Sequence, residues 1–243
     1  RPRASALVGE QYPRMRLLLT IATVVVALLV PVLLVTTSLR IVANDWIVSF
    51  EYDHGGVPED RYGLTEAQRR RLALLGLDSI LPGGRGAALL EEARLPDGRR
   101  AFDTRELQHM QDVRDVVGAI FRIQLAALVL LAVLTVALVW RAGPRRAWLR
   151  GLRSGAIATL ALAVGLGVLM LAAWDRFFVD FHGVFFEGDT WRFARTDTLL
   201  RLYPDEFWIG VAAWLTGIAL AGALVILVVT TVVLRRSRPR AGR

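Results

Sequence analysis

The residues best suited to chemistry in this 243-residue chain are two of its three histidines, His109 and His182. An imidazole titrates near neutral pH and can therefore accept and return a proton during a reaction. The sequence has no cysteine and no lysine, which excludes disulfides, thiol catalysis and Schiff-base chemistry. Ser49 and Ser79 lack the pattern of a nucleophile elbow. The third histidine, His54, lies in a glycine-rich stretch and is expected to be exposed.

His109 lies in a stretch that no proline or glycine interrupts. We predict a helix here, capped near Asp103 or Thr104 and continuing into the membrane. Glu106, His109 and Asp112 are three residues apart and would share one face of that helix. A carboxylate neighbour would orient the imidazole and raise its pKa. The competing interpretation is a solvated helix face that carries many charges.

His182 lies in the segment 174–191, which combines five phenylalanines with several carboxylates and follows a long apolar run. Simple turns favour Gly, Pro, Asn and Ser instead. One interpretation is an aromatic belt at the membrane–water interface. The other is a functional site close to the membrane, with His182 as its titratable member.

Four apolar runs must position these histidines. The chain is 54% hydrophobic with a mean hydropathy of +0.45, and each run reaches the roughly 20 residues that cross a bilayer. The first run is longer than the apolar core of a secretory signal, so we expect a retained anchor. The numbering starts at arginine, so we expect some residues to precede it. We predict an all-α membrane protein with transmembrane helices near residues 17–39, 118–140, 154–174 and 207–234.

The flanking charges predict the orientation of these helices. The two tails and the short loop after the second span carry 14 arginines and one acid, whereas the segments on the other side carry 15 arginines and 21 acids. By the positive-inside rule both termini and the short loop are cytoplasmic. The basic pI therefore indicates membrane lipids as partners, and no nucleic acid. Residues 40–117 then form a large extracytoplasmic segment, and residues 175–206 a second extracytoplasmic loop.

The extracytoplasmic region should be mixed but mainly helical. We predict a short strand at 47–52, turns at 53–56 and 95–98, and a short helix at 87–94. A further helix should be capped by Thr65. Pro204 fits the first position of the last helix, and Asp205 and Glu206 suit the positive end of its dipole.

The spans contain one proline and several glycines. Pro31 is expected to kink the first span. The glycines are expected to let helices pack closely in lipid: Gly165, Gly167, Gly210, Gly217 and Gly222.

His109 and His182 each lie within a turn or two of the end of a predicted span. Those ends can meet in a bundle, so we expect both imidazoles to face one cleft at the outer membrane surface. Two chemistries fit such a pair. They can act as acid and base on a lipid-like substrate, or bind a metal with one or two of Glu106, Asp112, Asp180 and Asp189. No H-x-x-E-H or H-x-x-x-H spacing supports a metal, so acid–base chemistry is favoured and no metal or other cofactor is expected.

Two segments resemble a known family. They read Glu106-x-x-His109-Met110-x-Asp112-Val113-Arg114, and Phe181-His182-x-x-Phe185-Phe186-x-x-Asp189-x-Trp191 followed by Asp197-x-Leu199-Leu200 and Tyr203-Pro204-x-x-Phe207. With four spans and a large first outer segment, the chain resembles the bacterial lipoprotein intramolecular transacylases along nearly its whole length. The resemblance implies transfer of the sn-2 acyl chain of a diacylglyceryl-cysteine lipoprotein to that cysteine's α-amino group, giving a lyso-form lipoprotein. It also implies catalytic roles for His109 and His182.

Our hypothesis for the site makes His182 the general base and acid. His109 would assist, held by Glu106 or Asp112. Either Arg114 or the indole N–H of Trp191 would stabilise the oxyanion. The substrate would be bound by Phe181, Phe185, Phe186, Asp189 and Asp197.

The alternative is a non-catalytic membrane protein whose outer region binds a partner protein or a metal ion. Catalysis requires His109 and His182 to converge on one cleft. A partner-binding protein would instead keep the histidines apart and expose an apolar or acidic patch on residues 40–105.

Overall fold

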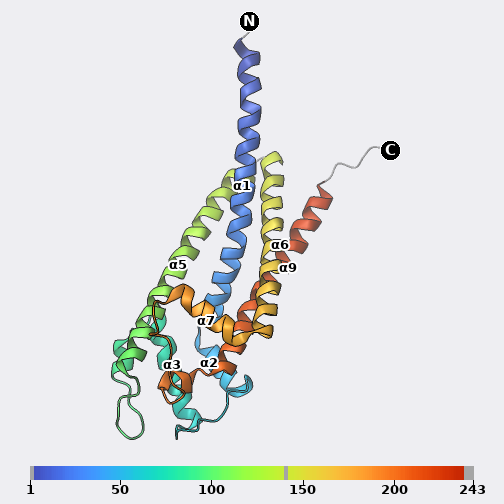
Figure 1. The fold of residues 1–243 in the computed structure, drawn as a ribbon. Coiled ribbons are helices and arrows are strands. Elements are labelled where there is room, and N and C mark those ends of the chain that lie inside the picture. The colour runs from blue at the N-terminus through green and yellow to red at the C-terminus, as the bar shows by residue number, and fades with distance from the viewer. Residues whose placement is uncertain (1–2, 140–141, 238–243) are drawn as a thin grey trace. The chain divides into compact units, whose positions relative to one another are not determined.

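The computed structural model describes residues 3–139 and 142–237, and helices make up most of them (Figure 1). The described residues contain no β-sheet, only an isolated antiparallel bridge between Arg94 and Arg100. The helices are α1 (Arg3–Val42), α2 (Asp45–His54), α3 (Glu66–Ile80), α4 (Ala88–Glu91), α5 (Thr104–Val139), α6 (Ala142–Ala172), α7 (Trp174–Phe185), α8 (Thr198–Leu202) and α9 (Asp205–Arg236).

Four of these helices are long and apolar enough to cross a membrane, which confirms the predicted all-α, four-span class. Their candidate spans are Met15–Val42, Thr104–Val139, Pro144–Ala172 and Asp205–Arg236. Each exceeds the roughly 20 residues that a bilayer requires, so the helices extend beyond the hydrocarbon region. In α5 the apolar part begins near Gly118, and residues 104–117 precede it. α1 continues through Pro31 without interruption.

The predicted loop after the second span is wrong, because α6 already begins at Ala142. Arginine is a good helix former, and its long side chain can reach polar surroundings from a helical backbone. The arginines expected in a loop therefore occupy the first turns of α6: Arg145, Arg146, Arg150 and Arg153. Other parts of these predictions lie outside the described residues: Arg1, Trp140, Arg141, Arg238, Arg240 and Arg243.

The chain forms two compact units, the first of which comprises residues 1–35, 124–165 and 218–243. Here Gly151 and Gly155 of α6 pack directly on the α1 backbone. A Cβ atom at Gly155 would lie 2.6 Å from the carbonyl oxygen of Ala27, and one at Gly151 would lie 2.8 Å from that of Thr23. This small-xxx-small spacing permits close helix approach in lipid.

The predicted glycine contacts are confirmed only in part. Gly222 packs closely, because a Cβ there would lie 2.7 Å from Leu34 Cδ2. Gly210 also lies in close contact, in the second unit. Nothing approaches within 4 Å of a Cβ built at Gly165, Gly167 or Gly217, so close packing is wrong for these three.

The second unit comprises residues 36–123 and 166–217 and contains the small helices. The predicted strand at 47–52 is wrong, since these residues belong to α2. Ile47, Val48, Glu51 and Tyr52 are buried, which is the spacing of one helix face rather than the alternation of a strand. The weak alternation in the sequence came from Ser49 between apolar residues.

The caps of α3 and α5 follow the sequence closely. Thr65 forms a capping box with Gln68, as expected for the start of α3. At the start of α5, Asp103 accepts a hydrogen bond from the Glu106 amide at 2.8 Å, and Glu106 accepts one from the Asp103 amide at 2.8 Å. Asp205 and Glu206 lie in the first turn of α9 as predicted, but Pro204 precedes that turn.

Buried polar contacts connect α8 to α2 and α3. The hydroxyl of Tyr52 donates to the carbonyl of Leu202 at 2.8 Å, and Tyr203 donates to the carbonyl of Ala73 at 2.5 Å. Arg201 donates two hydrogen bonds of 2.9 Å to Asp60, in a pair that is almost completely buried. These contacts hold in place the last part of the second segment that carries the family resemblance, which includes Leu202 and Tyr203.

The second predicted loop contains α7, a helix of twelve residues that starts just after Ala173. Trp174, Phe178, His182 and Phe186 are half-buried at intervals of four residues. Val184, on another face, is exposed. A helix whose aromatic face is half-buried is consistent with both interpretations of this segment, the interfacial aromatic belt and the functional site.

Candidate functional site

The imidazoles of His109 and His182 meet within the second unit, although 73 positions separate them in the sequence. Their ring centroids are 6.3 Å apart and the ring planes are 28° from parallel. His109 is supplied by the part of α5 that precedes the apolar span and is 8% exposed. His182 is supplied by α7 and is half-buried. Neither ring therefore lies free in solvent.

Four aromatic side chains surround the two imidazoles: Phe178, Phe186, Trp191 and Phe193. We call these four rings, together with the two imidazoles, the aromatic box. Around His109 lie Phe186 at 4.9 Å and Phe193 at 5.4 Å between centroids. Around His182 lie Phe178 at 4.0 Å and Trp191 at 4.8 Å. Phe178 and Phe193 were not predicted. Phe178 precedes His182 by one helical turn, a signal that was visible in the sequence, whereas Phe193 lies in an irregular segment without such a signal.

His182 has a defined tautomer in this arrangement. Its Nδ1 atom lies 2.7 Å from the carbonyl oxygen of Phe178, one helical turn earlier. A carbonyl oxygen only accepts, so Nδ1 carries the proton and Nε2 keeps its lone pair. Burial lowers the pKa of His182, and the bond to the Phe178 carbonyl opposes this shift. His182 is therefore a neutral base with Nε2 able to accept a proton.

His109 differs from the prediction. Its Nδ1 atom is buried and has no hydrogen-bond partner. Burial, reinforced by His182 and opposed by Asp112, lowers the pKa of His109 to about 4. The expectation that a carboxylate neighbour raises this pKa is wrong, because desolvation outweighs the attraction of Asp112.

The two carboxylates predicted to hold His109 make their hydrogen bonds elsewhere. Glu106 accepts from the amide of Asp103 and, at 2.7 Å, from the amide of Leu199 at the start of α8. Burial raises the pKa of Glu106, and these two amides oppose the shift. Asp112 accepts from the side-chain amide of Gln108 at 2.8 Å. Glu106 thus joins α5 to α8, and it does not orient the imidazole.

Replacing Glu106 by alanine is expected to lower the free energy of unfolding by roughly 1–3 kcal/mol for each of the two amides left without an acceptor. Titration with a denaturing detergent in mixed micelles would measure this loss. Glu92→Ala, which removes an exposed glutamate from the same unit, should leave the value nearly unchanged. Equal stability of the two variants would contradict the bridging role of Glu106.

The two candidate oxyanion donors have different surroundings. The guanidinium of Arg114 donates to the carbonyls of Ser79 at 2.7 Å, Leu81 at 2.9 Å and Gly84 at 3.2 Å. Its donors therefore stabilise the end of α3, which argues against Arg114 as an oxyanion donor. Trp191 is 8% exposed, and its buried Nε1–H has no hydrogen-bond partner. Of the two candidates, Trp191 has the donor that remains free.

The predicted substrate-binding residues divide into two groups. Phe186 belongs to the aromatic box, and Phe181 and Phe185 are 48% and 42% exposed on α7 beside it. The two aspartates make polar contacts of their own. Asp189 pairs with Arg192 at 3.2 Å on the surface, and Asp197 accepts from Arg105 at 3.2 Å and from the Ala194 amide at 2.8 Å. The phenylalanines thus remain candidates for acyl-chain contact, whereas both aspartates have structural partners.

The metal alternative finds no geometric support in the described part of the chain. No three His, Asp or Glu side chains there gather as a metal would require. The carboxylates proposed as ligands are engaged in other contacts. Glu106 accepts from backbone amides, Asp112 accepts from Gln108, and Asp180 pairs with Arg176 at 3.5 Å on the exposed face of α7.

His109 and His182 lie side by side, as the catalytic alternative requires, and not apart as expected of a partner-binding protein. Together with four candidate spans, it defines a multi-pass membrane protein with a paired-imidazole site.

Comparison with known proteins identifies the family. Residues 24–208 match the family described as lipoprotein intramolecular transacylase Lit. A protein of Aquifex aeolicus (strain VF5), described as uncharacterized, is 31% identical over 188 residues, which are 76% of this chain and 82% of that protein. The chain therefore belongs to the lipoprotein intramolecular transacylase family, and it is an acyltransferase.

Solved structures agree on the fold. The membrane-integral lipoprotein intramolecular transacylase Lit from Bacillus cereus superimposes with a TM-score of 0.77 at 19% identity, covering 91% of this chain and 98% of that one. A variant of the same enzyme with one histidine replaced by arginine gives a TM-score of 0.75 at 18% identity, covering 95% and 98%.

Proposed function

We propose that this transacylase moves the sn-2 acyl chain of a diacylglyceryl-cysteine lipoprotein to the α-amino group of the same cysteine, with His182 as general base and acid. The observation that carries this proposal is the pairing of a neutral base with an unused donor. His182 has Nε2 available, and the Trp191 ring stacked on it at 4.8 Å carries a buried N–H without an acceptor.

The first step joins the amine to the ester. The α-amino nitrogen attacks the sn-2 carbonyl carbon, and Nε2 of His182 takes a proton from that nitrogen. Negative charge develops on the former carbonyl oxygen, where a hydrogen bond from the Trp191 indole would stabilise it. Excluding water from the aromatic box strengthens the hydrogen bond between the Trp191 indole and the oxyanion.

The second step releases the glycerol oxygen. The carbon–oxygen bond of the ester breaks, and the protonated His182 returns its proton to the departing oxygen. The product has an amide at the cysteine nitrogen and a free hydroxyl at sn-2, and no proton is gained or lost overall. His109, beside His182, would limit the space around the reacting atoms and keep the pair of rings dry.

The acyl chains would lie against the phenylalanines of α7. Phe181 and Phe185 offer exposed apolar surface next to the aromatic box, and hydrocarbon chains gain free energy by leaving water for such a surface. The arginine distribution supports an extracytoplasmic site with both termini in the cytoplasm.

Reconstitution tests the reaction directly. The protein in proteoliposomes should convert a synthetic lipopeptide with different acyl chains at sn-1 and sn-2 into an isomer of equal mass. Tandem mass spectrometry should find the sn-2 chain on the cysteine nitrogen. Isotope-labelled phospholipid in the same vesicles should contribute no label. A labelled N-acyl chain would show that the donor is another lipid, which would overturn the intramolecular proposal.

The pH dependence should contain two ionisations. An α-amino group loses its proton near about 7.7–8, so the rate should fall about tenfold per pH unit below that range. Burial lowers the pKa of His182, so the base stays neutral below the ordinary histidine value of about 6.5. The slope of log rate against pH should therefore steepen from about one to about two only below about pH 6.5. Steepening at or above that pH would contradict a buried neutral base.

A further inference from the structure

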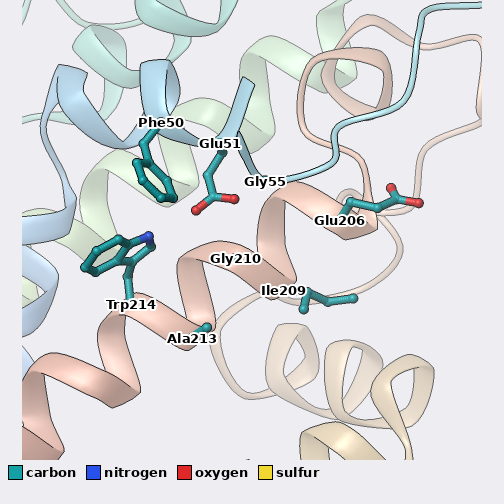
Figure 2. Close-up of a pocket in the computed structure, with 8 residues that line it drawn as sticks. All are labelled: Phe50, Glu51, Gly55, Glu206, Ile209, Gly210, Ala213 and Trp214. Atoms are coloured by element: carbon teal, nitrogen blue, oxygen red, sulfur yellow. The ribbon is translucent and has the colours of Figure 1, made fainter. Parts of the chain in front are cut away.

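A second polar feature lies outside the aromatic box, in a pocket between α2 and the start of α9. The pocket has a volume of about 380 Å³ and belongs entirely to the second unit. Figure 2 shows the carboxyl group of Glu51 directed into it, with the Trp214 indole below and Gly210 on the adjoining helix. We call this the Glu51 pocket. The remaining lining residues are Phe50, Gly55, Glu206, Ile209 and Ala213.

Two glycines make room for the carboxyl group. A Cβ atom at Gly210 of α9 would overlap the Glu51 carboxyl oxygens, and one at Gly55 would overlap Oε2. Any other residue at either position would displace the group. The pocket is thus shaped around this side chain.

Glu51 is 1% exposed, and its Oε2 atom has no hydrogen-bond partner. A buried carboxyl oxygen without a donor is unfavourable for folding, and native proteins usually avoid it. Such an oxygen directed into a pocket indicates that a ligand supplies the missing donor.

Burial raises the pKa of Glu51, and the Trp214 indole beside it opposes the shift. Among the residues that the structure describes, no cation contributes to the pKa shift of this carboxyl. Glu206 of α9 lines the pocket and is itself acidic. Arg69 and Arg70 of α3 face Tyr52, and Arg70 pairs with Asp53.

Aromatic rings form one wall. The Phe50 and Trp214 centroids are 5.2 Å apart, and Trp46 lies 5.1 Å from Trp214, with the planes nearly perpendicular in both pairs. Ring faces attract cations, and they do so more strongly where water is excluded. A divalent metal would instead require several oxygen ligands, whereas much of this lining is apolar.

We propose that the Glu51 pocket binds a primary ammonium group, which donates to Glu51 Oε2 and rests against the Phe50 and Trp214 rings. In the bound state the carboxylate of Glu51 forms an ion pair with the ammonium. At a membrane this group occurs on the free α-amino end of a lipidated cysteine and on the ethanolamine headgroup of a phospholipid. The first source rests on the proposed function, as a site that holds the amine before it reaches His182, and the second does not.

The test uses a lipopeptide whose two chains are ether-linked, so that no acyl transfer can occur. One form has a free α-amine and the other an acetylated one. Calorimetry in micelles should find that the wild-type protein binds the free amine about tenfold more tightly, the worth of one charge-assisted bond. Glu51→Gln, which keeps the shape, should abolish this preference. Asp45→Asn, the same charge change on an exposed residue of α2, should keep it.

A second arm compares nanodiscs of phosphatidylethanolamine and phosphatidylglycerol by native mass spectrometry of retained lipid. If the wild-type protein retains the ethanolamine lipid and Glu51→Gln does not, the result supports the proposal and identifies the phospholipid headgroup as the source of the ammonium group. If Glu51→Gln fails to fold, Trp214→Leu replaces it in both measurements. This variant removes one of the two rings that would contact the ammonium, so it should also reduce the preference for the free amine.

The proposal is overturned if Glu51→Gln keeps the preference for the amine, or if the wild-type protein shows no such preference for either source. Since the probes do not react, a failure of acyl transfer in the reconstituted system would count against the proposed function alone.

Discussion

Replacing His182 by alanine is expected to slow conversion of diacyl lipoprotein to the lyso form by about 10²–10⁴-fold. The variant removes the only group in the aromatic box that combines an available ring nitrogen with a fixed tautomer. The appropriate measurement is the single-turnover rate with the synthetic lipopeptide in proteoliposomes, because product release then does not limit the result.

Arg176→Ala provides the matched control on the same helix. The Arg176 side chain is 82% exposed and pairs only with Asp180, so its loss should change neither the rate nor the melting temperature appreciably. Full activity in His182→Ala would remove the general-base assignment. A melting temperature far below that of the wild-type protein would trace the defect to folding instead.

Replacing Trp191 by phenylalanine is expected to lower kcat by about 10²–10³-fold with little change in KM. Phenylalanine keeps an aromatic ring against His182 but lacks the buried N–H. A donor that acts on developing charge stabilises the transition state more than the bound ester, so its loss appears in kcat.

Trp148→Phe makes the same chemical change in the other unit, where the indole donates to Thr135 at 3.1 Å. This control should leave kcat unchanged. An unchanged kcat in Trp191→Phe would mean that the oxyanion is stabilised by another donor. A raised KM with normal kcat would mean that Trp191 acts only as part of the wall around the substrate.

The sequence predicted the parts of the fold that follow from simple periodicity and capping. Long apolar runs have few alternatives to membrane helices, and the caps at Thr65 and Asp103 use local hydrogen bonds that involve only neighbouring residues. The meeting of His109 and His182 was predicted from their places near span ends.

Contacts between distant segments were harder to predict. The engagement of Glu106 with Leu199, 93 positions away, and of Arg114 with carbonyls near the end of α3, depends on packing that no local pattern encodes. Local reasoning assigned both to catalysis because charged residues near a histidine are often functional. The Glu51 pocket was missed for the same reason, since Gly55 and Gly210 acquire their role only when α2 meets α9.

The two imidazoles are carried by very different helices. His109 belongs to α5, which has 36 residues, whereas His182 belongs to α7, which has twelve residues and no fully buried side chain. If His182 acts as proposed, substitutions that weaken the packing of α7 are expected to abolish activity while most of the protein stays folded. Activity and resistance to heat are then expected to be separable, and screening variants by heat resistance alone would overlook inactive ones.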